Sequence, residues 1–431
     1  MVFKPINKLE VKRTLSDSTE LLVGVLAQNR QGVYFQFDQN YLDQYSNLSP
    51  FSLSFNRDVQ LAPKSPHNGL HGVFSDCLPD GWGSLLQDRV FRQNNIMPNF
   101  VTAMDRLSFV GHSAMGALSF TPEANYNIPS EEEPGLAELG QQAQAIFDGQ
   151  TETVLSALVA AGSSGGARPK AQVYFPEHNI EECRTQPKIG DDAWLIKFTS
   201  KNLSLGHEEG LCEAVYLELA DKAKLSTPER LLVNAPEGTG AKQWLALKRF
   251  DRFKLPSNKM GRKHMHSACG LLDADFRAPT LDYEDLIKAS RVLCKSPAAG
   301  QLQFRRAIFN LFSCNQDDHS KNWAFLQEDS GEWNLAPFYD VTFSPHPFNE
   351  HATSFAGYGK NPPIKAIQKL ASAAGYANWK QVQIIISEIA DIVFSFKDTA
   401  KTFEVNKQTI QLIEQQLDNT YRINKQLCGS L

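Results

Sequence analysis

A short polar segment between two apolar ones carries residues that could do chemistry. It reads "NQDDHSKN" at 315–322, and Asp317 and Asn322 lie five positions apart within it. A further aspartate, Asp340, follows in "LAPFYDVTF". Protein kinases place an Asp, an Asn and a later Asp in this order, where the first handles the proton of the acceptor hydroxyl and the others hold Mg²⁺. The spacing predicts Asp317 as a catalytic residue, with Asn322 and Asp340 as metal ligands.

Asp318 is the competing candidate in the same segment. Its fifth following position is Trp323, which cannot ligate a metal, so the register favours Asp317. A second interpretation requires no chemistry, because polar residues here could cap helices and solvate a loop. On that interpretation His319 and Lys321 are structural or surface groups.

A lysine in an apolar stretch is a candidate for binding phosphate. Lys197 lies in "WLIKFT", and a buried ammonium is unfavourable unless it reaches water or an anion. Glu213, in the next helix-like segment, is a reasonable ion-pair partner of the kind that positions a phosphate-binding lysine. The alternative is an edge-strand lysine whose charged end reaches water.

A glycine-rich segment, "SSGGARPK" at 163–170, is a third candidate. Glycines allow backbone N–H groups to converge on phosphate oxygens, and Arg168 and Lys170 add positive charge. The segment lacks the Walker A pattern, and a plain flexible loop is the alternative. Phosphorylation of its serines would make it anionic.

The elements that must position these residues follow from the hydrophobic pattern. Short branched and aromatic runs predict strands at 20–28, 32–38 and 51–55, and a helix is expected to end near Arg92. Further strands are predicted at 193–199 and 243–251, with one directly after the glycine-rich segment. Helical spacing is seen at 153–161, 208–223, 283–293, 304–313, 379–396 and 408–417. The glycine-rich segment and Lys197 thus precede a mostly helical half that carries Asp317.

Composition limits the class of protein. The 431 residues hold 43 Lys and Arg against 48 Asp and Glu, a net charge of −5, so the whole chain is no nucleic-acid-binding polyelectrolyte. Its seven cysteines are scattered without a CxxC pair, which argues against disulfides or a zinc site. No secretory signal or membrane-length apolar run is found, and we expect a soluble cytoplasmic protein.

Six stretches together resemble the HipA family of bacterial toxin Ser/Thr kinases. They are "FSDCLPDGWG", "SSGGARPKA", "WLIKF", "LKRFDR", "NQDDHSKN" and "LAPFYD", running from residue 74 to 340. The resemblance implies an α+β, two-lobed protein-kinase-like fold with a β-rich N-terminal module and an all-helical C-lobe. The expected domains are 1–125 for the module, 126–254 for the N-lobe with its glycine-rich loop, and 255–431 for the C-lobe.

The resemblance also implies ATP and Mg²⁺ as cofactors and assigns the site. Asp317 falls on the catalytic position, Lys197 on the ATP-contacting lysine, and 248–250 on the hinge, while His319, Lys321 and Tyr339 fall beside nucleotide-contacting positions. The expected nucleotide-contacting residues are Gly165, Gly166, Ala167, Arg168, Pro169, Lys170, Lys197, Lys248, Arg249, Phe250, His319, Lys321, Asn322, Tyr339 and Asp340. Ser163, or with less support Ser164, aligns with an autophosphorylation site whose modification switches the kinase off.

Partners follow from the same resemblance. The family's usual partner is a small DNA-binding antitoxin, HipB-like, which would contact operator DNA and supply most of the positive charge. The usual substrate is an aminoacyl-tRNA synthetase, typically the glutamyl enzyme, and no membrane partner is expected. This chain departs from the best-known member in its loop, "GGARPK", and at Lys248, where that member has an acid.

Two other functions would use the same residues differently. A catalytically silent corepressor would bind its antitoxin on DNA, but it has no physical need for Lys197, Asp317, Asn322 and Asp340 together. A small-molecule kinase would use the same order of Asp, Asn and Asp, and it would show an acidic cleft for a cationic acceptor substrate.

Overall fold

The computed structural model describes residues 3–126, 134–154, 158–159, 165–177, 179–257 and 259–429. The chain forms two compact units, neither of which is continuous in sequence. The first comprises 1–207, 230–273 and 326–332, and the second comprises 208–229, 274–325 and 333–431.

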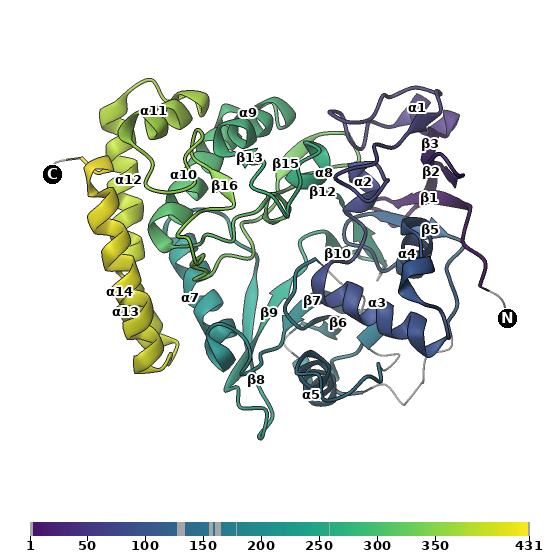
Figure 1. The fold of residues 1–431 in the computed structure, drawn as a ribbon, viewed down its shortest axis with the longest axis horizontal. Helices are drawn as coiled ribbons and strands as arrows, with labels where there is room; N and C mark the ends of the chain where they lie inside the picture. Colours follow the sequence, from purple (N-terminus) through teal and green to yellow (C-terminus); the bar gives the residue numbers. More distant parts are fainter. Residues whose placement is uncertain are drawn as a thin grey trace. The chain divides into compact units, whose positions relative to one another are not determined.

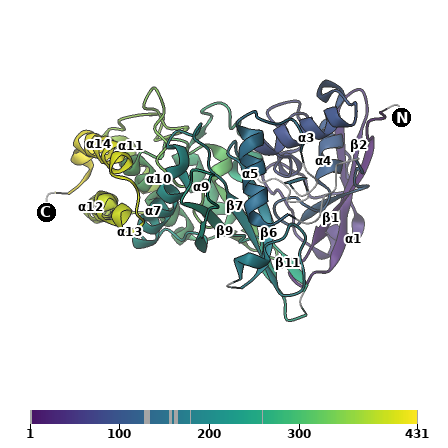
Figure 2. The same ribbon diagram turned by 90° about the horizontal axis from the view of Figure 1, so that it is seen from below.

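The N-terminal sheet of the first unit is antiparallel. Its strands are β1 (Lys8–Thr14), β2 (Glu20–Gln28), β3 (Val33–Phe37), β4 (Gln60–Leu61) and β5 (Leu118–Thr121), in the order β4-β3-β2-β1-β5. Burial alternates along β3, so one face carries the core residues Phe35 and Phe37. Figure 2 shows β1 and β2 side by side near the N-terminus.

Four helices accompany this sheet in the sequence: α1 (Gln39–Gln44), α2 (Gly72–Ser75), α3 (Gly81–Gln93) and α4 (Ala103–Val110). Thr102 and Asp105 form a capping box at the start of α4, which fixes where that helix begins. Apolar residues of α2 and α4 enter the core of the N-terminal sheet, whereas Trp82, Leu86 and Val90 of α3 enter a second core.

That second core belongs to a four-stranded antiparallel sheet in the order β6-β7-β9-β8. Its strands are β6 (Lys170–Pro176), β7 (Asp191–Lys197), β9 (Gln243–Lys248) and β8 (Arg230–Asn234), and α5 (Leu136–Phe147) packs into the same core. Lys170 and Lys197 are directly opposite each other in the β6–β7 register. The sheet therefore places two predicted phosphate-binding lysines on neighbouring strands.

Shorter elements complete the first unit: β10 (Arg252–Lys254), β11 (Met260–Arg262), β12 (His264–Ser267), α8 (Ala268–Leu271), η1 (Pro98–Phe100), η2 (Ile180–Glu182) and η3 (Gly206–Glu208). Gly72 and Gly270 let α2 and α8 approach closely, since a Cβ on Gly72 would lie 2.0 Å from the Gly270 carbonyl oxygen.

The second unit is mainly helical. Its helices are α7 (Glu209–Lys222), α9 (Tyr283–Leu293), α10 (Pro297–Ser313), α11 (Ile364–Ala373), α12 (Trp379–Phe394), α13 (Phe396–Thr402) and α14 (Lys407–Asn424), with η4 (Ser320–Asn322) and η5 (Lys425–Leu427). Figures 1 and 2 show α12 and α14 side by side, in agreement with their contacts.

The prediction of an all-helical C-lobe is wrong in one respect. Within 255–431 the chain also forms β13 (Leu281–Asp282), β14 (Ala324–Gln327), β15 (Trp333–Leu335) and β16 (Thr353–Ser354), besides the short strands already given. Strands of two to four residues are too short for the alternation by which a strand is recognised in sequence.

Most predicted elements are confirmed, and one strand is not. β2 and α9 begin and end where predicted. The segment at 51–55 forms turns instead, because Leu53 N–H folds back to the Ser49 carbonyl at 2.9 Å and Phe51 stays 43% exposed. The helix predicted at 153–161 lies largely outside the described residues.

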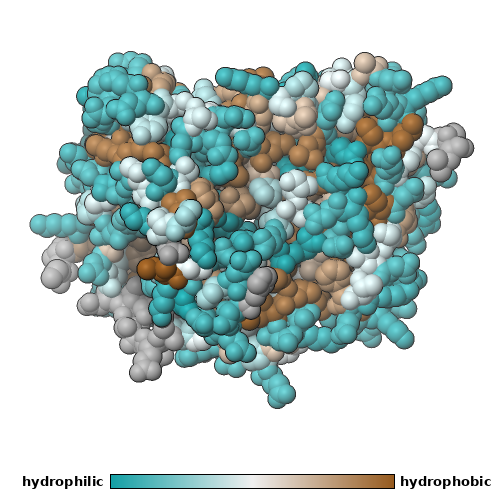
Figure 3. All heavy atoms as spheres, turned by 180° about the vertical axis from the view of Figure 1, so that it is seen from behind, coloured by the Kyte–Doolittle hydropathy of each residue, from teal (hydrophilic) through white to brown (hydrophobic). Residues whose placement is uncertain are grey.

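Figure 3 shows one face of the molecule, where polar side chains dominate and apolar ones occur at several separate places. None of the helices in the described ranges has the length and apolar character needed to cross a bilayer.

Candidate functional site

The segment that carries Asp317 follows directly from the end of α10. Cys314 caps that helix in the left-handed conformation, with φ 56°, and its N–H donates to the Asn310 carbonyl. Because the chain reverses there, residues 316–319 leave the helix as an extended segment before η4 begins at Ser320.

The two neighbouring aspartates have opposite environments. The Asp318 carboxylate is fully buried and accepts hydrogen bonds from the Tyr283 hydroxyl at 2.5 Å, from Thr353 N–H at 3.1 Å and from His351 Nδ1 at 2.9 Å. The Asp317 side chain is 66% exposed. Asp318 is thus committed to the fold, whereas the Asp317 carboxylate faces outward.

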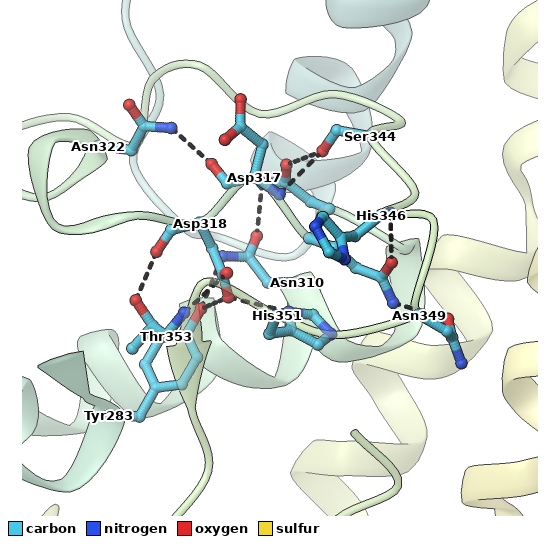
Figure 4. A network of polar contacts seen from close by, with 12 residues as sticks. Tyr283, Asn310, Asp317, Asp318, Asn322, Ser344, His346, Asn349, His351 and Thr353 are labelled. Carbon is cyan, nitrogen blue, oxygen red and sulfur yellow. Dashed lines mark hydrogen bonds and ion pairs between the residues drawn. The ribbon is translucent and has the colours of Figure 1, made fainter. Parts of the chain in front are cut away.

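A chain of hydrogen bonds, buried at Asp318 and exposed at its other end, leads back from Asp318 to the Asp317 backbone (Figure 4). Asn310 Nδ2 donates to the Tyr283 hydroxyl at 2.9 Å, and Asn315 Nδ2 donates to Asn310 Oδ1 at 2.9 Å. Ser344 Oγ then donates to Asn315 Oδ1 at 2.8 Å and accepts the Asp317 N–H at 3.2 Å. These bonds fix the peptide that presents Asp317.

Burial raises the pKa of the Tyr283 hydroxyl well above its ordinary value, and the charge of Asp318 raises it further. The phenol therefore stays protonated and acts as a donor to Asp318 at any physiological pH. Its role is to hold Asp318, so Tyr283 positions the segment and does not itself meet a substrate.

A hydrogen bond joins the two segments that carry the predicted metal ligands. Tyr339, next to Asp340, donates its hydroxyl proton to the Lys321 carbonyl, next to Asn322, at 2.7 Å. Asn322 Nδ2 donates to the Asp317 carbonyl at 2.7 Å, which orients its amide oxygen away from that contact. Asp340 has a left-handed backbone, with φ 56°, a conformation that aspartate adopts more readily than most residues.

This donor set fits Mg²⁺. The ion prefers oxygen ligands and takes one or two from protein, completing its shell with phosphates and water. The Asn322 amide oxygen and the Asp340 carboxylate are ligands of this kind, and the ion needs no third acidic or histidine side chain from the protein. No cluster of three His, Cys, Asp or Glu side chains that could hold a metal is found among the residues that the structure describes.

His319 and Lys321 contact an aromatic ring that sequence reasoning did not single out. Lys321 Nζ lies 4.3 Å from the centre of the Phe276 ring, and the His319 ring is 5.9 Å from it in an edge-to-face arrangement. His319 Nε2 lies 3.8 Å from an Asp317 oxygen.

In the first unit, the described part of the glycine-rich segment rests on the start of α3. The Asp80 carboxylate accepts the Gly166 N–H, and the Trp82 N–H donates to the Gly166 carbonyl at 3.0 Å. The Trp82 indole donates to the Lys170 carbonyl at 2.9 Å. A Cβ on Gly81 would lie 2.7 Å from the Gly166 oxygen, so glycine is required there. The motif "PDGWG" therefore supports the segment.

Lys170 and Lys197 are both buried, at 4% and 5% exposure. Lys170 Nζ donates to the Gly165 carbonyl at 2.6 Å, so the lysine at the start of β6 closes the glycine-rich segment onto its own strand. Gly166 has φ 100° and leaves room for that ammonium group, which a Cβ would approach to 2.6 Å. Arg168 lies on the same segment.

The predicted hinge residues differ in what they can offer a nucleotide. Arg249 N–H donates to the Ala193 carbonyl at 2.9 Å, and its guanidinium is bound to Asp251 and Gln172. The side chain of Arg249 is therefore part of the fold, and a nucleotide contact from this residue would come from its carbonyl. Lys248 Nζ lies 3.5 Å from an Asp192 oxygen.

Asp251 is the centre of a buried charge cluster. Burial by itself would raise its pKa, but the charges of Arg249 and Arg252 outweigh it, and the pKa falls to about 2. Gly116 N–H donates to Asp251 at 2.6 Å, and Arg252 donates to the carbonyls of Gly116 and Ala114 at 2.6 and 2.7 Å. This cluster ties the strand after β9 to the loop before β5.

Several predicted residues remain predictions. Ser163 and Ser164 lie outside the described residues. Lys197 and Glu213 fall in different units, so their ion pair is untested. Sequence reasoning missed Asp80, Tyr283, Phe276 and His351. Asp80 stands in a quoted motif and could have been considered, whereas the other three acquire their roles only from contacts made across the fold.

Two family profiles and a relative match most of this chain. The profile of the HipA-like C-terminal domain matches residues 162–396, and that of the HipA N-terminal domain matches 18–121. A protein of Sinorhizobium fredii called "Putative kinase Y4mE" is 30% identical over 340 residues, 74% of each chain.

A solved structure supports the fold. A chain in the complex of HipA, HipB and operator DNA from Shewanella oneidensis matches with a TM-score of 0.68 and 17% identity, over 98% of this chain and 100% of that one. The fold is thus kinase-like with a sheet-rich N-terminal part, as predicted. With both domain profiles matched in order, the chain belongs to the HipA family.

Proposed function

We propose that this protein is an ATP- and Mg²⁺-dependent serine/threonine protein kinase and the toxin of a toxin–antitoxin pair. The observation that carries the proposal is the contrast between Asp317, exposed and fixed through its backbone, and Asp318, buried and fully engaged. The backbone of Asp317 is fixed by hydrogen bonds to Ser344 and Asn322, so its exposed carboxylate is presented from a defined position.

The residues have separable roles in this proposal. As the acceptor oxygen bonds to the γ-phosphorus and the bond to the ADP oxygen breaks, the hydroxyl proton passes to Asp317. Asn322 and Asp340 would hold Mg²⁺, and the bound ion would neutralise charge on the phosphates. Lys197 and Lys170 would bind phosphate oxygens, together with N–H groups of the glycine-rich segment other than that of Gly166, which Asp80 accepts.

Partners and substrate are proposed from the relatives. The Shewanella protein is found with HipB and operator DNA, and we propose a HipB-like antitoxin that carries this chain to DNA. The proposed substrate is an aminoacyl-tRNA synthetase, the glutamyl enzyme first. Autophosphorylation at Ser163 would place a dianion in the phosphate-binding segment and inactivate the enzyme.

Phosphopeptide mass spectrometry after incubation with Mg²⁺ and ATP tests the proposal. The wild type should gain phosphate at 163–164, and Asp317→Asn should lose it while keeping its thermal unfolding profile. Asp398→Asn, which removes an exposed carboxylate of α13, is the matched control and should behave as wild type. If unphosphorylated wild type binds ATP but transfers no phosphate to itself or to a synthetase, the kinase proposal is wrong and the silent corepressor replaces it.

A further inference from the structure

One hairpin connects the two predicted metal ligands. Asn322 immediately precedes Trp323 and β14, and Asp340 follows β15 after a short loop. The tip of the hairpin, 326–332, belongs to the first compact unit, whereas its base belongs to the second. The tip is therefore built into a different set of residues from the ligands at the base.

A buried arginine of the N-terminal sheet holds the tip. Arg13 on β1 is 1% exposed, and it donates to Gln327 Oε1 at 3.1 Å and to the Glu328 carbonyl at 3.3 Å. It also donates to the Tyr41 hydroxyl at 3.1 Å and lies 3.5 Å from an Asp329 oxygen. A buried guanidinium needs such partners, so its position is tightly determined.

Other contacts within the first unit seat the same tip. Gln327 Nε2 donates to the Asn47 carbonyl at 2.9 Å, and Ser16 N–H donates to Asp329 at 2.9 Å. Lys263 pairs with the Glu328 carboxylate at 2.7 Å. Gln327, the last residue of β14 before the turn, is fully buried. The tip is thus anchored and is not a free surface turn.

The two strands are joined all the way from tip to base. The cross-strand contacts are Glu328 N–H to Glu332 C=O at 2.9 Å, Ala336 N–H to Ala324 C=O at 2.9 Å, Trp323 stacked on Phe338 at 5.6 Å, and Tyr339 hydroxyl to Lys321 C=O at 2.7 Å. β14 and β15 are neighbours in the three-stranded sheet β12-β14-β15, and the contacts between them and between their flanking residues link the tip of the hairpin to its base.

We propose that Arg13 is a positioning residue for the metal-binding pair, acting through the β14–β15 hairpin. By fixing the tip, it sets the spacing and order of Asn322 and Asp340 at the base. The N-terminal sheet then serves the chemistry of the chain as well as any docking role. This inference rests on the proposed kinase function for its metal readout but not for its structural one.

The experiment uses the full chain with Arg13→Met, Arg13→Lys and Gln327→Met. At saturating ATP, the Mg²⁺ concentration for half-maximal phosphoryl transfer should rise about 10-fold in Arg13→Met and Gln327→Met, because residues that orient metal ligands change metal affinity by that order. Arg13→Lys should recover part of the loss. Hydrogen exchange at 320–325 and 336–341 should accelerate in the same variants, measured well below their unfolding temperatures.

Lys12→Met is the matched control, since Lys12 is next to Arg13 on β1, partly exposed, and paired only with Glu20 at 3.3 Å among the described contacts. It should leave both readouts unchanged. Folded Arg13→Met and Gln327→Met with wild-type exchange at the hairpin base would overturn the proposal. If wild type transfers no phosphate, the kinase function fails by itself, and the exchange data still decide the role of Arg13. Should Arg13→Met fail to fold, Gln327→Met gives the answer.

Discussion

Two buried carboxylates next to the proposed functional segments are neutralised in different ways. Asp251, in the first unit, lies among charges: Arg249 Nε donates to it at 2.9 Å, and Arg252 adds a second guanidinium close by. Asp318, in the second unit, accepts hydrogen bonds from two uncharged donors, the Tyr283 hydroxyl and the Thr353 N–H.

The difference shows what each cluster is for. A cluster of full charges is strongly destabilised when one member is removed, because the remaining charges stay buried. Such a charge cluster is suited to holding two segments rigidly together, as it does for the strand after β9 and the loop before β5. A network of shared hydrogen bonds loses less stability when one member is removed, but it fixes the orientation of each group. That property suits the segment that presents Asp317.

The largest expected effect is that of Asp251→Asn. Removal of this carboxylate leaves Arg249 and Arg252 buried without their counter-charge, and the free energy of unfolding should fall by about 3–5 kcal/mol. Urea denaturation followed by circular dichroism measures it. Asp398→Asn, at an exposed ion pair of α13, should change little. A loss for Asp251→Asn no greater than for that control would mean that the cluster is not held by charge.

Acid should reveal the same cluster. The pKa of Asp251 is lowered to about 2 in the folded protein, below its usual value of 3.8, so its stabilisation is complete above pH 4 and is lost as the pH falls through about 2. The contribution is about 2 kcal/mol. Wild type should therefore lose more stability than Asp251→Asn between pH 5 and 2. Parallel curves for the two proteins would contradict the prediction.

Tyr283→Phe tests the hydrogen-bonded cluster. It removes one donor to Asp318 and the acceptor of Asn310 Nδ2, so the free energy of unfolding should fall by about 1–2 kcal/mol. Because the same bonds fix the Asp317 peptide, the rate of phosphoryl transfer should fall more than ATP binding does. Tyr421→Phe, in α14 of the same unit, is the matched control. Equal rates of phosphoryl transfer for the two variants would show that Tyr283 does not influence the site.

The smallest effect is expected from Lys248→Met. Its ion pair with Asp192 is 3.5 Å long and the two side chains are 29% and 12% exposed, so water weakens the interaction. The change in unfolding free energy should be about 0.5 kcal/mol. ATP affinity should stay the same if the hinge binds through its backbone. A large drop in affinity, measured by titration calorimetry, would assign the Lys248 side chain to the nucleotide.

The sequence predicts those elements whose pattern is strong and local. β2 and α9 are predicted correctly because their apolar periodicity runs over several residues, whereas the roles inferred from the spacing of Asp317, Asn322 and Asp340 remain predictions. Sequence reasoning failed for the strands of the second unit, which are too short to show alternation. At 51–55 it found alternation without a strand, since pairing depends on a partner that a single segment does not reveal.

The sequence by itself determined, through its motifs, the family to which the chain belongs, and it supplied the candidate residues for the proposed phosphoryl transfer. Only the tertiary structure decided the environment of each group. It buried Asp318 and exposed Asp317, bound the side chain of Arg249 into the fold, and brought Arg13 to a hairpin more than 300 residues away in sequence. The physical reason is that burial and hydrogen-bond partners come from residues distant along the chain, and these set what a carboxylate or guanidinium can do.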